Sequence, residues 1–156
     1  MKFERLSPIY FEDFYNVFTE IITRDFPEYS EDTKQLFLQK FYSKELLKST
    51  INLEDRFYLL CLEDSELIGF LFANKPFGGV GFISWVGVKN HKRRKGIGKA
   101  LLGHYEEYCK DWNAHLVELY TFSKTQKFYE LCGYEKVGYR KKGYFGVENI
   151  IMDKEI

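Results

Sequence analysis

The sequence contains little proline, little cysteine and no excess of either charge. Only three prolines occur among 156 residues. No linker, repeat or low-complexity tract interrupts the chain, so a single domain over residues 1–156 is expected. The three cysteines are widely spaced and odd in number. They form no CxxC or Cys/His cluster, so we expect reduced thiols in the core and no metal site.

Long apolar runs are also missing. No stretch approaches the roughly 20 apolar residues that a membrane span needs. The N-terminal sequence MKFERLSPIY lacks the apolar segment of a signal peptide. These absences predict a cytoplasmic protein with no membrane partner.

The charges balance, because Lys and Arg together number 23 and Asp and Glu together also number 23. Proteins that bind nucleic acid mainly through electrostatics usually carry an excess of positive charge. Zero net charge therefore argues against a nucleic-acid partner. Aromatic residues make up 19% of the chain, an abundance consistent with thick core layers and a substrate cleft.

Hydrophobic periodicity changes along the chain and predicts alternating helices and strands. Strands are expected at 2–6, 57–63, 67–73, 81–88, 115–121, 135–140 and 148–155. Helices are expected from Ser7-Pro8 to before Pro27, from Ser30, at 43–51, from the glycines after residue 95 to about Asn113, and from Ser123 through Leu131. Ser123 with Gln126 has the form of a capping box, and Gly133 has the position of a helix C′ residue. The predicted fold class is α/β, with a mixed central sheet of six to seven strands flanked by helices.

One stretch, KRRKGIGKALL at residues 92–102, places four cationic residues before two glycines and a helix start. The stretch admits three interpretations: a phosphate site, a nucleic-acid contact or a solvated basic turn. Glycines at 96 and 98 let main-chain N–H groups converge at the helix start, where the helix dipole favours an anion. Neither GxGxxG nor the P-loop pattern GxxxxGK[ST] is present.

The neighbouring sequence favours the first interpretation. Arg93-x-x-Gly96-Ile97-Gly98 follows a strand ending in Val88 and precedes Ala100-Leu101-Leu102. This arrangement resembles motif A of the GNAT superfamily of N-acetyltransferases. About 30 residues later, FYELCGY at 128–134 is similar to the family's FYEKLGF segment, and ENIIMDKEI resembles its closing strand. Over about 80–156 the likeness rests on specific motifs. Over 1–79 it rests only on the order of the expected helices and strands.

The resemblance implies a GNAT fold and acetyl-CoA as cofactor. On this reading, the amides from Arg93 to Gly98 hold the pyrophosphate, and the strand edge at Val86–Val88 pairs with the pantetheine arm. The implied cofactor-binding residues are Val86, Gly87, Val88, Arg93, Arg94, Lys95, Gly96, Ile97, Gly98, Lys99 and Ser123. Ser123 is included as the polar neighbour of Phe122, which stands where many members carry an asparagine.

The resemblance also implies direct acetyl transfer to a primary amine. Tyr129 matches the family's general-acid position, and a backbone N–H near Val86–Val88 would stabilise the oxyanion. The strand at 81–88 lacks the acid that many members use as a base, so Glu118 on the next strand is a tentative base beside a water relay. The region at 10–29, with Asp25, Glu28 and Tyr29 near its end, is expected beside the acceptor cleft.

Two other functions remain open at this point. One is a non-catalytic CoA-binding module, which would share the motif but not the role of Tyr129. The other is a nucleic-acid-binding domain that uses the basic residues at 89–99. The sequence does not identify the acceptor amine, which is either a small molecule or an amine of a protein. The family resemblance makes a homodimer plausible.

Overall fold

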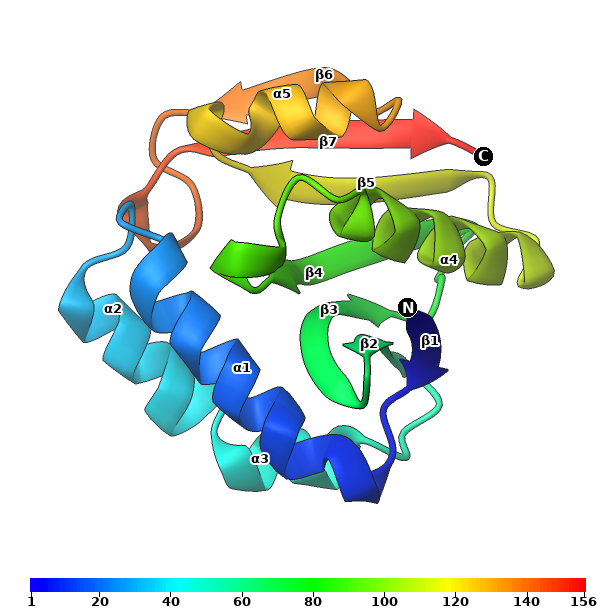
Figure 1. Cartoon of the computed structure of the whole chain (residues 1–156). Coiled ribbons are helices and arrows are strands. Elements are labelled where there is room, and N and C mark those ends of the chain that lie inside the picture. The colour runs from blue at the N-terminus through cyan, green and yellow to red at the C-terminus, as the bar shows by residue number, and fades with distance from the viewer.

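The computed structural model describes residues 1–156, which fold around a seven-stranded mixed sheet (Figure 1). The strand order is β1-β2-β3-β4-β5-β7-β6. Only β4 and β5 are parallel, and every other neighbouring pair is antiparallel. The strands are β1 (Lys2–Arg5), β2 (Arg56–Glu63), β3 (Glu66–Asn74), β4 (Val80–Val88), β5 (Leu116–Thr121), β6 (Glu135–Arg140) and β7 (Asn149–Glu155). The predicted mixed sheet is confirmed.

Helices cover both faces of this sheet. They are α1 (Phe11–Asp25), α2 (Glu31–Leu36), α3 (Lys44–Thr50), α4 (Ile97–Asp111) and α5 (Ser123–Leu131). A π-helical turn, η2 (Phe37–Phe41), continues α2. In Figure 1, α1–α3 gather beside β2–β4, α4 lies beside β4, and α5 lies beside β6 and β7.

The alternation of side chains along β2 explains why its sequence reads as an unbroken apolar run. Phe57, Leu59 and Cys61 join a core with α4 and β5 on one face. Tyr58, Leu60 and Leu62 join a second core with α1, η2 and α3 on the other. Successive residues of a strand point to opposite faces, so a strand covered on both sides is apolar throughout.

Local signals placed most helix ends correctly. Ser30 caps α2 by accepting from the amide of Thr33 at 3.2 Å, and α1 ends before Pro27. Gly133 follows α5 with a φ of 92°, the left-handed conformation that suits glycine at a C′ position. The Asp64-Ser65 turn joins β2 to β3, with φ of 50° and 67°.

One predicted cap is absent and another differs in detail: Ser7 is the N-cap of a helical turn that begins with Pro8, as its position in the sequence suggests, but the turn is 3₁₀. Ser7 caps nothing with its side chain, and Pro8–Tyr10 forms a 3₁₀ turn, so α1 begins only at Phe11. The capping box at Ser123 and Gln126 is absent, because Phe122 occupies the N-cap and Ser123 is already helical. Gln126 instead donates to Glu130, one turn further along α5, at 2.7 Å.

The three cysteines were expected to be thiols in the core. Cys61, Cys109 and Cys132 are buried free thiols, as the sequence predicted. Burial raises the pKa of the Cys109 thiol to about 11, which keeps it protonated and unreactive.

None of the helices combines the length and the apolar character that crossing a membrane requires.

Candidate active site

The centre of the sheet opens where β4 and β5 separate. β5 pairs with β4 only from Val80 to Ile83, whereas β3 remains paired with β4 as far as Val88. The β4 edge from Ser84 to Val88 therefore lacks a strand partner on its β5 side. This unpaired edge includes Val86–Val88, where the family resemblance implies that the pantetheine arm pairs with the strand.

An irregularity in β4 lies where the opening begins. On the β3 side, Ala73 pairs with Ile83 and Phe72 pairs with Trp85, which leaves Ser84 as an extra residue. Such a bulge bends the strand and increases its twist. The bulge and the loss of pairing with β5 thus coincide at one position.

The loop after β4 leads into α4 with six unpaired amides. The amide nitrogens of residues 94–99 donate to no backbone or side-chain acceptor, and the first helical bond runs from Ala100 to the carbonyl of Gly96 at 2.9 Å. Arg94 and Gly96 have positive φ angles of 61° and 78°, which turn the chain sharply before the helix. Free N–H groups at the positive end of a 15-residue helix form a natural anion site.

The two glycines of the motif serve different physical needs. Gly96 has open space around its Cα, so its left-handed backbone is what favours glycine. Gly98 has an ordinary φ, but a Cβ there would lie 2.9 Å from the Phe128 ring. Gly98 therefore permits α4 to begin directly against α5.

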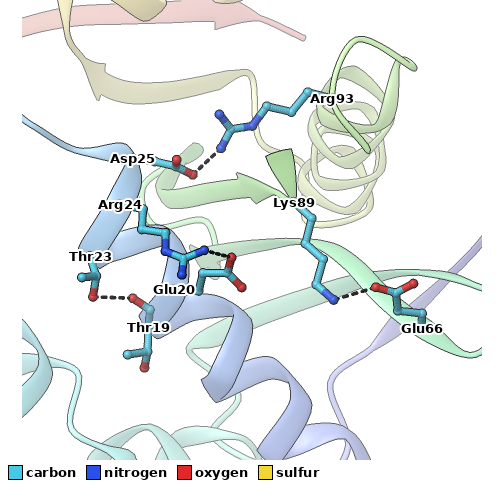
Figure 2. A network of polar contacts seen from close by, with 8 residues as sticks. All are labelled: Thr19, Glu20, Thr23, Arg24, Asp25, Glu66, Lys89 and Arg93. Atoms are coloured by element: carbon cyan, nitrogen blue, oxygen red, sulfur yellow. Dashed lines mark hydrogen bonds and ion pairs between the residues drawn. The ribbon is translucent and has the colours of Figure 1, made fainter. Parts of the chain in front are cut away.

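Arg93 is engaged by protein atoms and does not present a free guanidinium. Its Nε donates to the carbonyl of Val88 at 3.0 Å, and its terminal nitrogen pairs with Asp25 at the end of α1 (Figure 2). Its backbone amide donates to the carbonyl oxygen of Asn90 at 3.2 Å. Of the amides from Arg93 to Gly98 that were expected to hold a pyrophosphate, that of Arg93 is already bonded within the chain, and those from Arg94 onward are free.

Other cations of the basic stretch are paired too. Lys89 contacts Glu66 at 2.7 Å (Figure 2), and Lys92 pairs with Glu63. Both pairs tie the loop to the β2–β3 hairpin. Arg94, Lys95 and Lys99 form no ion pair and are exposed, so they supply the free positive charge beside the six amides.

A cavity of about 830 Å³ joins this loop to the opened strand. Its wall is formed by α1, β4, the loop at 92–99 and α5. Of the predicted cofactor residues, it includes Val86, Gly87, Val88, Arg93, Arg94, Gly96, Ile97, Gly98 and Lys99. Lys95 and Ser123 do not line it.

Ser123 is held elsewhere by a residue that the sequence did not single out. Its amide and hydroxyl both donate to the Glu148 carboxylate, at 2.8 and 3.0 Å. A carboxylate on the first turn of a helix is favoured by the helix dipole, so Glu148 anchors the start of α5. Thr125, in the first turn of α5, lines the cavity in place of Ser123.

A second cavity, of about 490 Å³, lies on the other side of the opening. It is lined largely by aromatic side chains and by Glu118. Phe26, Val86, Thr125 and Tyr129 line both cavities. The two cavities therefore meet at Tyr129, and an acyl group bound in one can reach a nucleophile bound in the other.

Tyr129 has the properties of a proton donor at this junction. Its hydroxyl is not engaged by any hydrogen bond of the chain, and its ring packs on Phe128 and Tyr134 with centroids 4.9 and 6.0 Å apart. Burial, and to a smaller extent Cys132, raises the pKa of the phenol above its ordinary value. Tyr129 therefore stays protonated at neutral pH.

Two site residues escaped the sequence analysis because their roles depend on tertiary contacts. Phe26 and Thr125 come from α1's end and from α5, and both lie where the cavities meet. Of the residues expected beside the acceptor cleft, Tyr29 lines the second cavity, whereas Asp25 lines the first. Glu28 lines neither and pairs with Lys124 at 3.1 Å.

Known proteins share this architecture. The model of the acetyltransferase (GNAT) family matches residues 11–134. The PaiA N-acetyltransferase from Thermoplasma acidophilum, solved with coenzyme A, is similar with a TM-score of 0.84 at 24% identity, over 99% of this chain and 98% of that one. The aminoglycoside 6′-N-acetyltransferase from Enterococcus faecium gives 0.72 at 18% identity, over 99% and 97%. No curated protein has a sequence that matches significantly.

Proposed function

The chain belongs to the acetyltransferase (GNAT) family, and from that premise we propose that it transfers the acetyl group of acetyl-CoA directly to an amine. The predicted family, enzyme class and cofactor, an N-acetyltransferase that uses acetyl-CoA, are confirmed by the match. The amine acceptor, the roles of the individual residues and a single acetyltransferase domain over 1–156 are parts of the proposal. The cytoplasmic location and the homodimer stay predictions.

The observation that carries the proposal is the row of six unpaired amides at residues 94–99. These donors fit a pyrophosphate, and Arg94, Lys95 and Lys99 add positive charge beside it. The unpaired edge of β4 at Val86–Val88 supplies backbone groups for an amide-containing arm, at the mouth of the same cavity. Arg93 holds the loop against β4 instead of binding phosphate through its side chain.

Acetyl-CoA supplies the reaction with an acetyl thioester. Val86 lines both cavities, so its amide lies at their junction, where a backbone N–H can donate to the carbonyl oxygen as it gains negative charge. Tyr129 holds a proton at its hydroxyl and releases it to the departing sulfur. The aromatic walls of the second cavity exclude water from the nucleophile.

The acceptor amine must lose a proton to attack. Glu118 is the only carboxylate on the wall of the second cavity, and a carboxylate within reach of an amine, directly or through one water, can accept this proton. We assign Glu118 this role. Ser84, at the bulge, is the polar neighbour from β4 that also lines this wall.

The two rival functions are less well supported. A nucleic-acid surface needs free cations, but Lys89, Lys92 and Arg93 are paired with carboxylates of the same chain. A non-catalytic CoA-binding module would not need a second cavity that meets the first at a protonated tyrosine. Both features therefore favour the enzyme.

The proposal is tested by thiol release from acetyl-CoA with the purified protein and a broad panel of amines. Release that depends on an amine, with acetylated amine found by mass spectrometry, supports it. Tyr129→Phe should lower kcat at least tenfold while CoA binding persists. The control is Tyr139→Phe on β6, whose ring is exposed and lines neither cavity. Tight CoA binding without transfer to any amine would favour the module instead.

A further inference from the structure

The second cavity is walled by aromatic rings from three separate parts of the chain. Eleven of its eighteen lining residues are Phe, Tyr or Trp. Phe37 comes from the π-helical turn η2, Trp85 from β4 and Phe145 from the loop between β6 and β7. The Phe37 ring lies 4.7 Å from that of Phe145 and 5.8 Å from that of Trp85, edge to face in both cases. The rings thus support one another around a preformed apolar chamber.

The lining of the chamber carries a single ionisable carboxylate and no cationic side chain. Glu118 is its one charged lining residue, and no lysine, arginine or histidine lines it. An ammonium group is complemented both by this carboxylate and by the faces of the rings. A carboxylate or phosphate on the ligand would have no cationic partner and would be costly to bury.

The position of the reacting amine follows from the residues that the two cavities share. Val86, Thr125 and Tyr129 mark the end at which the chamber meets the cofactor cavity. Phe145 lines the chamber but not the cofactor cavity. A ligand with its amine at the shared end therefore places the rest of its body against Phe37, Trp85 and Phe145.

We infer that the acceptor is a primary amine with an aromatic or similarly apolar body and no anionic group. The inference rests on the proposed function, because it takes the chamber as the acceptor site. A volume of about 490 Å³ suits a body of one or two rings. A polyamine or an aminoglycoside carries several ammonium groups, for which the chamber offers a single carboxylate. An amino acid carries the anionic group that the chamber lacks a partner for.

The test compares acceptors that differ in one property at a time, at fixed acetyl-CoA. 2-Phenylethylamine and tryptamine represent the inferred class, and n-butylamine removes the ring. L-phenylalanine adds a carboxylate to the same body, and spermidine and kanamycin add cationic groups. The two aromatic amines should have kcat/KM values at least about tenfold above each of the others. The free energy gained by burying a ring corresponds to at least about a tenfold change in affinity.

A pair of neighbouring phenylalanines separates the chamber wall from its surroundings. Phe145 lines the chamber, whereas Phe41 does not, although their rings lie 6.0 Å apart and their exposures are 46% and 43%. Phe145→Ala should raise KM for 2-phenylethylamine about tenfold and leave KM for acetyl-CoA unchanged. Phe41→Ala should leave both constants close to those of the wild type.

The outcomes separate this inference from the proposed function. If spermidine, kanamycin or L-phenylalanine is the best acceptor, the inferred class is wrong while acetyl transfer to an amine stands. If the aromatic amines are best but Phe145→Ala and Phe41→Ala behave alike, the chamber does not bind the aromatic body and the inference also fails. If CoA binds but no amine of any class is acetylated, the proposed function itself fails.

Discussion

The Nε of Arg93 donates to the carbonyl oxygen of Val88 at 3.0 Å and so joins the loop before α4 to the last residue of β4. The same guanidinium pairs with Asp25 at the end of α1. One side chain therefore fixes three elements around the cofactor cavity. Its two engagements leave the loop amides, together with Arg94, Lys95 and Lys99, free for the phosphates in the proposed function.

This arrangement predicts that the shape of the Arg93 side chain matters more than its charge. Arg93→Lys keeps the charge but cannot make both contacts, so CoA affinity should fall about tenfold in calorimetric titrations, as expected for one charge-assisted hydrogen bond. Arg94→Lys is the matched control and should change the affinity less than threefold. Equal effects of the two substitutions would show that Arg93 acts only as a charge.

The close approach of α4 to α5 predicts a specific intolerance at Gly98. A Cβ at this position meets the Phe128 ring at 2.9 Å, whereas a Cβ at Gly103, in the same helix, meets nothing. Gly98→Ala should lower the free energy of unfolding by about 1–2 kcal/mol through overpacking and weaken CoA binding. Gly103→Ala should raise it by up to about 1 kcal/mol through helix propensity. Urea titrations of both variants measure the free energy of unfolding. A Gly98→Ala variant as stable as the wild type would contradict this account.

The raised pKa of Tyr129 predicts the pH dependence of transfer. The phenol must be protonated to serve as an acid, and burial keeps its pKa above the ordinary value of about 10. Activity should therefore rise as the amine and its base lose protons and then stay level to about pH 10. A descending limb in kcat between pH 7 and about 9 that is absent from Tyr129→Phe would contradict the raised pKa of this phenol.

The position of Glu118 predicts a loss of chemistry without a loss of cofactor binding. Glu118→Gln should lower kcat by about 100-fold or more, as removal of a general base does. CoA affinity should be unchanged because Glu118 lines only the second cavity. Asp153→Asn is the control, since Asp153 is the cross-strand partner of Glu118 but lines neither cavity. Similar losses in both variants would point to a general effect of acidic charge on this face.

Much of the site was predictable because its signals are local. The glycines at 96 and 98 and the helix start specify a cradle of backbone amides through short-range geometry. The second cavity was not predictable in the same way, because Phe37, Trp85 and Phe145 are far apart in the sequence and meet only in the fold. The same reason explains Ser123: its pattern resembled a capping box, but Glu148, 25 residues away, binds its amide and hydroxyl.

The central claim is that the amides of residues 94–99 bind the pyrophosphate of the cofactor. Backbone ¹H–¹⁵N spectra of the labelled protein, recorded as CoA is added, test it directly. The account predicts that these six amides shift furthest downfield, as new hydrogen bonds to an anion require, while the paired amide of Arg93 shifts less. Saturating CoA that leaves the six amides unmoved, or the absence of any CoA binding, would contradict it.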